Sequence, residues 1–158
     1  MPVQTSDAVN VFYLGAEEKL KFGIFHWDNG IAYQTTSDQY IMPLPTFVWN
    51  SNVYLRTPPI FKKSLTFQVG AELNYHTSFY AQKYNPATGM LYVQREKEYG
   101  DYPLLNVYGQ AQLKVLKMFM VWNHVNQKMG NNSNYMISPG YAMSPSFLRV
   151  GISVTFDD

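Results

Sequence analysis

The sequence predicts an all-β fold, an antiparallel up-and-down meander of about seven strands. Three observations lead to this prediction. Apolar and polar residues alternate with a period of two in several segments, as they do along strands whose two faces meet different surroundings. No sustained helical apolar spacing and no capping box before an apolar run is found. Short and long connections also alternate along the chain.

Residues 65–76 and 105–115 show the clearest alternation. Each segment is long enough to cross a bilayer as a tilted strand, which takes about 9–11 residues. Their odd-numbered positions form the apolar face, which includes Leu65, Phe67, Val69, Leu73, Leu105, Val107 and Leu113. Their even-numbered positions form the polar face, which includes Gln68, Glu72, Asn74, Asn106, Tyr108, Gln110, Gln112 and Lys114.

Weaker alternation predicts the remaining strands, which are expected over 12–22, 25–34, 47–56, 118–126 and 147–156. The polar faces of these strands include Glu17, Lys19, Lys21, Arg56, Arg149 and Ser153. Glu18 is an exception, because it falls on the apolar side of its strand. The final strand carries Val150, Ile152 and Val154 on its apolar face and ends in the aromatic Phe156.

The connections sort by length. Short ones are expected near Phe22–Gly23, near 58–63, and at a two-residue hairpin turn at Leu116–Lys117. Long ones are expected over 36–46, 78–102 and 127–144, and they are rich in Gly, Pro, Asn and Ser. In an antiparallel meander all the long loops then lie at one end. Outer-membrane barrels have this asymmetry, and a soluble sandwich has no reason for it.

The composition is compatible with a membrane barrel. Aromatic residues make up 16% of the chain and charged residues only 15%, against a usual charged fraction of about 25%. No run approaches the roughly 20 apolar residues that a transmembrane helix needs. In a barrel the apolar face would contact lipid and the polar face would line the lumen. A soluble antiparallel sheet with aromatic cross-strand pairs is the alternative interpretation.

Other functions find little support. The net charge of +1 argues against a nucleic-acid partner, and the absence of Cys excludes disulfides and Cys-based zinc sites. His26, His76 and His124 lie on separate strands and are not expected to share a metal. Glu17, Asp28 and Glu72 are interpreted as solvated carboxylates rather than a catalytic pair. No catalytic motif occurs, so neither an enzyme nor a cofactor is expected.

The charged residues of the polar face lead to a hypothesis about which solutes the protein prefers. Five are cationic and two are anionic, which predicts a slight preference for anionic solutes. Simple charge pairing from strand to strand is the alternative. The residues counted are Lys19, Lys21, Arg56, Lys114 and Arg149 against Glu17 and Glu72.

Several stretches resemble the C-terminal part of the Bacteroidetes-type putative porin family. They are GIFHWDNGIAYQ, the MPLP of Met42 to Pro45, LTFQVGAELNYHTSFYAQKYNPATGM, WNHVNQKMG and the closing RVGISVTFDD. FHWDN and YHTSFYAQKYNPATG are the more specific motifs. The resemblance covers nearly the whole chain. It implies an outer-membrane β-barrel that passes solutes, and it brings no catalytic residues.

The resemblance also implies context. Residues 1–158 would be one segment of a larger barrel, without its N-terminal signal and earlier strands. Its partners would be the outer-membrane bilayer, the barrel assembly machinery and small solutes, and Phe156 would serve as the C-terminal assembly signal. Two alternatives remain open: a soluble β-barrel or sandwich that binds a ligand through aromatic loops, and an outer-membrane barrel with a structural or secretion-related role.

Overall fold

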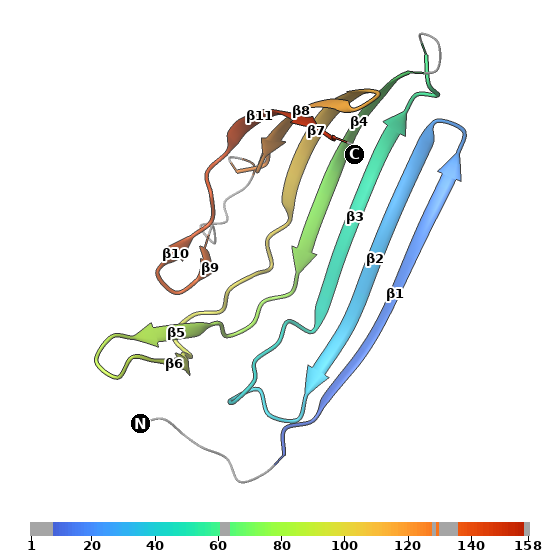
Figure 1. The fold of residues 1–158 in the computed structure, drawn as a ribbon. Helices are drawn as coiled ribbons and strands as arrows, with labels where there is room; N and C mark the ends of the chain where they lie inside the picture. The colour runs from blue at the N-terminus through green and yellow to red at the C-terminus, as the bar shows by residue number, and fades with distance from the viewer. Residues whose placement is uncertain (1–7, 61–63, 128, 130–135, 157–158) are drawn as a thin grey trace.

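A computed structural model describes residues 8–60, 64–127, 129 and 136–156. Its main feature is one large sheet of long strands, as the two-residue periodicity predicted (Figure 1). The described part of the chain contains no helix long and apolar enough to span a membrane. The strands of the sheet are β1 (Val11–Phe22), β2 (Phe25–Thr36), β3 (Phe47–Arg56), β4 (Leu65–His76), β7 (Leu104–Leu113), β8 (Leu116–Asn123) and β11 (Phe147–Val154).

The sheet is an antiparallel meander, which confirms the predicted fold class. Its strand order in the described residues is β1-β2-β3-β4-β7-β8-β11, so each strand pairs with the next long strand of the chain. Adjacent strands keep a continuous register without a bulge. The sheet curves, and β1 and β11 form its two edges without pairing with each other (Figure 1).

The connections alternate in length and lie at opposite ends of the sheet, also as predicted (Figure 1). Short connections join β1 to β2, β3 to β4 and β7 to β8. Long ones join β2 to β3, β4 to β7 and β8 to β11. Two of the long loops contain short hairpins of their own, formed by β5 (Gln82–Asn85) with β6 (Met90–Val93) and by β9 (Met136–Ser138) with β10 (Tyr141–Ala142).

The predicted position of the β7–β8 turn was wrong by two residues. Leu113 pairs with Leu116, so the turn is formed by Lys114 and Val115. Lys114 adopts the left-handed φ of 51° that such tight hairpins require, although Gly or Asn is the usual residue there. Because the strand period is two, a two-residue shift leaves every side chain on the expected face. Met118, Met120 and Trp122 therefore lie on the apolar face, opposite Ile152, Val150 and Leu148 of β11.

The buried side chains belong mostly to the loops rather than to the sheet. Of the described residues that are nearly inaccessible, the strands of the large sheet contribute only Ser51. The others lie in the long loops or at their bases: Ala81, Gln94, Tyr99, Tyr102, His124 and Asn126. A soluble sheet domain would show the reverse, with strand residues buried under a second layer.

Candidate functional site

The register places the predicted polar-face residues together on one side of the sheet. Arg56 pairs with Gln68, which pairs with Gln110, and the same alternation extends to both edges. Lys114 lies instead in the β7–β8 turn, beyond the end of the strand. The residues that share the face are Glu17, Lys19, Lys21, Arg56, Gln68, Glu72, Asn74, Asn106, Tyr108, Gln110, Gln112, Arg149 and Ser153.

Hydrogen bonds connect the centre of this face across three strands. The Nε2 of Gln110 donates to the Oε1 of Gln68 at 3.0 Å, and the Nε2 of Gln68 donates to the hydroxyl of Tyr108 at 3.1 Å. Tyr108 in turn donates to the Oδ1 of Asn52 at 3.0 Å. Each side chain uses its polar atoms in a defined direction, so the network holds β3, β4 and β7 in register and keeps their surface polar.

Aromatic rings lie over glycines on this face. A Cβ on Gly70 would come within 2.6 Å of the Tyr54 Cβ and 2.8 Å of the Tyr108 hydroxyl, so only glycine lets these two tyrosines occupy their positions. A Cβ on Gly151 would likewise overlap the ring of Phe119. The imidazole of His26 stacks on Tyr54, with 4.7 Å between the ring centroids. Closely packed aromatic rings therefore form part of this face, and their polar groups lie at its edges.

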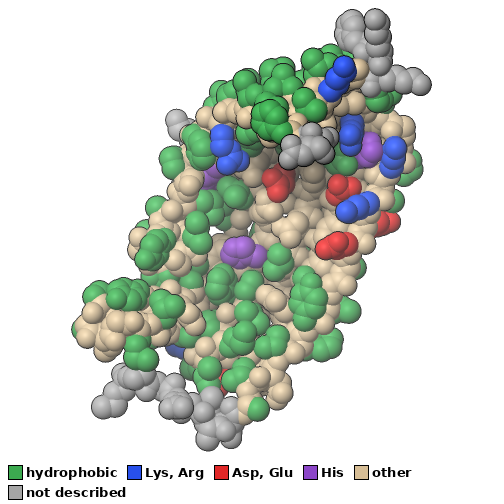
Figure 2. All heavy atoms as spheres, viewed as in Figure 1, with side chains coloured by type: hydrophobic (Ala, Val, Ile, Leu, Met, Phe, Trp, Pro, Cys, Tyr) green, Lys and Arg blue, Asp and Glu red, His purple; other side chains and the backbone are tan. Residues whose placement is uncertain are grey.

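Charged side chains gather on the same face, over the half of the sheet nearer the short turns (Figure 2). Lys19 is opposite Asp28 in the register, and Glu72 is one strand beyond Asn52. Glu17, Lys19, Asp28 and Glu72 line a shallow hollow of about 220 Å³ with asparagines between them. No ion pair joins two charges of this face among the residues that the structure describes.

The opposite face of the sheet is apolar and uncovered. The exposed fraction is 54% for Val69, 65% for Val150 and 44% for Val154. Phe67, Val107, Leu113 and Ile152 are also exposed, while Leu65, Leu73 and Leu105 are half-buried by their neighbours in the sheet. Within the described residues, no element packs over these side chains as a second layer. Soluble monomers rarely expose a contiguous apolar surface of this kind.

Sequence reasoning missed a buried polar cluster at the base of the long loops. His124, only 1% exposed, lies just after β8 with its Nε2 2.7 Å from the Tyr102 hydroxyl. Its Nδ1 lies 3.0 Å from the carbonyl of Ser144, and the Tyr102 hydroxyl donates to the carbonyl of Asn126. The cluster therefore joins the loop before β7 to both ends of the loop between β8 and β11. The strand expected over 118–126 included His124 and Asn126, whereas β8 ends at Asn123, so the alternation gave no sign of this cluster.

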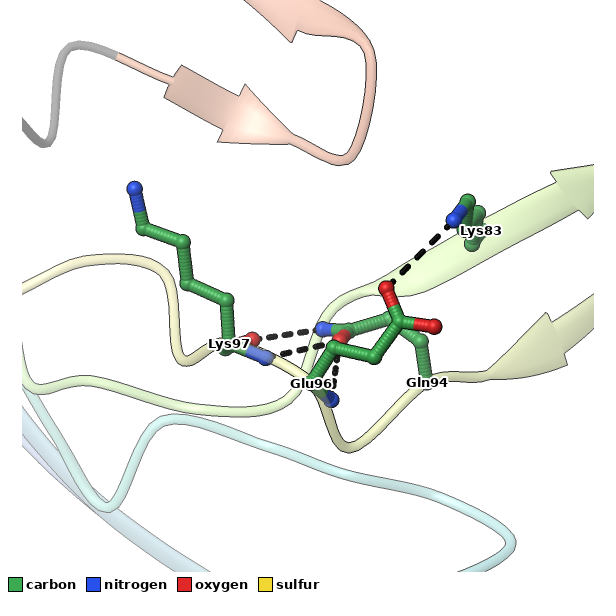
Figure 3. A network of polar contacts seen from close by, with 4 residues as sticks. All are labelled: Lys83, Gln94, Glu96 and Lys97. Atoms are coloured by element: carbon green, nitrogen blue, oxygen red, sulfur yellow. Dashed lines mark hydrogen bonds and ion pairs between the residues drawn. The ribbon is translucent and has the colours of Figure 1, made fainter.

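A second polar network fixes the loop between β4 and β7 (Figure 3). The buried Oε1 of Gln94 accepts hydrogen bonds from the backbone N–H groups of Glu96 and Lys97, and its Nε2 donates to the Lys97 carbonyl at 2.6 Å. Glu96 also forms an ion pair with Lys83 at 3.5 Å. The guanidinium of Arg95 lies over a tyrosine ring of the neighbouring β2–β3 loop. The long loops are thus built structures that contact one another.

The long loops also enclose a hollow of about 770 Å³. Most of its lining is apolar or aromatic, with few polar groups. All three long loops contribute to it, through Met42, Leu44, Phe79, Tyr84, Leu91 and Tyr141 among others.

The three histidines lie in different parts of the fold, and His124 lies just after β8 rather than on the strand expected over 118–126. His26 and His76 lie on the polar face, the first next to a short turn and the second at the start of a long loop, while His124 is in the buried cluster. Among the described residues, no three His, Cys, Asp or Glu side chains come close enough to hold a metal ion.

An antiparallel meander with one polar and one uncovered apolar face, and with long loops at one end, defines a porin-like protein. A family model described as "putative porin" matches residues 1–158, so the chain belongs to that family. The family is of the channel type rather than a family of enzymes. No curated protein and no solved structure matches the chain significantly.

Proposed function

We propose that the seven long strands form part of the wall of an outer-membrane β-barrel through which small solutes pass passively. The uncovered apolar face supports this proposal most directly. Only helices and closed barrels can cross a bilayer, because every backbone polar group must find a partner there. The two edge strands do not pair with each other, so closure needs further strands between β11 and β1. The protein then acts as a passage.

In this arrangement the apolar face contacts lipid and the polar face lines an aqueous lumen. The lipid-facing residues would include Phe67, Val69, Val107, Leu113, Val150 and Val154, and the lumen-facing residues those of the Gln68–Tyr108 network. The long loops would restrict the entrance on one side. Phe156, which is 87% exposed directly after β11, remains the predicted assembly signal.

The charge of the lumen supports a slight preference for anions. Lys117 and Asp28 join the charged residues of this face that the sequence analysis counted. Cationic side chains still outnumber acidic ones: Lys19, Lys21, Arg56, Lys117 and Arg149 against Glu17, Asp28 and Glu72. Replacing Lys21 and Arg56 with Gln should shift the reversal potential under a salt gradient toward cations, and an unchanged value would overturn the preference.

Conductance of the full-length protein in planar bilayers tests the passage itself. We expect discrete channel openings and swelling of liposomes in small neutral sugars. A protein that inserts, shows heat-modifiable migration in gels and conducts nothing would instead have a structural or secretion-related role. A protein that stays soluble without detergent would be the ligand-binding sheet of the first alternative.

A further inference from the structure

The apolar face carries one central row of polar side chains. In the register Glu18 of β1 is opposite Asn29 of β2, and Asn29 is opposite Ser51 of β3. The positions on either side of Glu18 along this face are Ala16 and Leu20, so the row lies well inside the apolar surface and away from the strand ends. This is the one position at which the alternation of β1 failed in the sequence.

Two tryptophans, one on each side of the row, donate hydrogen bonds to it. The indole Nε1 of Trp27 donates to the Oγ of Ser51 at 2.9 Å, and the Nε1 of Trp49 donates to the Oδ1 of Asn29 at 3.3 Å. Each indole thus reaches diagonally to the neighbouring strand. Ser51, which is only 8% exposed, is the buried residue of the sheet. The row is therefore an ordered, hydrogen-bonded polar site on a surface that is otherwise apolar.

Among the described residues, Glu18 has no such partner. Its side chain is exposed, and it forms no ion pair in the part of the chain that the structure describes. An ionisable side chain facing hydrocarbon is costly and as a rule marks a place where the lipid is displaced. The described strands carry no Lys or Arg on the apolar face, so an isologous contact with a second copy of this surface would set no cation against Glu18.

We propose that the Glu18–Asn29–Ser51 row is the docking site for a different polypeptide embedded in the same membrane, which presents a Lys or Arg to Glu18. Charge complementarity identifies this partner, because a cation removes the cost of the carboxylate. The two tryptophans suit the same role, since Trp and Arg are enriched where binding energy is concentrated. This inference rests on the proposed membrane location of the apolar face.

Photo-crosslinking of the full-length protein in its native membrane tests the proposal. The crosslinker p-benzoylphenylalanine replaces Ile31, which is 48% exposed and lies diagonally across from Glu18, so the polar row stays intact. The matched control carries it in place of Phe67, which is 45% exposed on the same face but lies on β4. Adducts are separated by mass and sequenced, with and without the charge reversal Glu18→Lys.

We expect a heavier protein adduct from position 31, whose partner peptide contains Lys or Arg, and loss of that adduct in Glu18→Lys. Position 67 should give only lipid adducts. Lipid adducts at both positions, an adduct of twice the chain's mass, an adduct within the chain, or an adduct indifferent to Glu18→Lys would overturn the docking site. Absence of lipid adducts at position 67 would instead overturn the membrane location.

Discussion

At the scale of single residues, the polar face depends on fitted pairs of glycines and aromatic rings. Gly70 leaves room for Tyr54 and Tyr108, and Tyr108 then reaches Asn52 and Gln68. Such contacts have no signature in a periodic pattern, because the pattern only indicates that glycine and tyrosine share the polar side. The alternation predicted the face of these residues, but their packing follows from the three-dimensional register.

Gly70→Ala should lower the free energy of unfolding by about 1–3 kcal/mol, because the new methyl group overlaps both tyrosines. Gly109→Ala is the matched control on the neighbouring strand. A Cβ at Gly109 has nothing within 4 Å, so that variant should stay within about 0.5 kcal/mol of the original. Urea unfolding of the full-length protein in lipid vesicles, followed by tryptophan fluorescence, measures both. Equal effects would show that the tyrosines do not pack as described.

The cluster of Tyr102 and His124 permits a second prediction at this scale. Tyr102→Phe removes the hydroxyl that contacts His124 and the carbonyl of Asn126, leaving buried polar groups unpaired at a cost of about 1–3 kcal/mol. We expect faster proteolysis in the long loops and an unchanged resistance of the strands. Tyr84→Phe, at a ring that is 50% exposed, is the control and should cleave at the original rate. Protection of the Tyr102→Phe loops equal to the original would contradict the cluster's role.

At the scale of elements, each long strand separates two surroundings. The alternation was enough to predict all seven long strands and which of their side chains share a face, because a period of two is a direct consequence of extended backbone. Lys114 is the exception, since it lies in the β7–β8 turn. The β7–β8 turn could not be placed from the sequence, since Lys114 is not a usual residue at positive φ. The short hairpins in the loops and the Gln94 network were also missed, because they depend on local side-chain contacts and have no repeating pattern.

The same substitution should lower the free energy of unfolding by different amounts at neighbouring positions of β4, because these positions lie on opposite faces. Val69→Arg places a charge on the apolar face, and lipid contact there should cost about 2–4 kcal/mol. Gln68→Arg places the same charge on the polar face. It removes the hydrogen bonds of Gln68 with Tyr108 and Gln110, each worth about 1 kcal/mol, and should still cost less than Val69→Arg. Urea unfolding in vesicles compares the two variants. A larger loss for Gln68→Arg would mean that the faces are assigned the wrong way round.

At the scale of the whole molecule, the absence of a sheet-covering layer in the described residues connects fold to function. The strands bury almost nothing, and what is buried lies in the loops that gather at one end (Figure 1). In the proposed membrane location, hydrocarbon covers the apolar face of such a sheet. The family match says that the chain is porin-like, and the proposed barrel wall would set the apolar face against lipid and the polar face against water.

The position of the lipid is therefore the central claim, and the chain's lack of Cys makes it directly measurable. Single cysteines at Val69, Val107, Gln68 and Gln110 of the full-length protein would carry a fluorescent label in vesicles. Labels at Val69 and Val107 should be quenched by nitroxide lipids and not by aqueous iodide. Labels at Gln68 and Gln110 should be quenched by iodide and not by nitroxide lipids. Iodide quenching at Val69 and Val107 without lipid quenching would contradict the account.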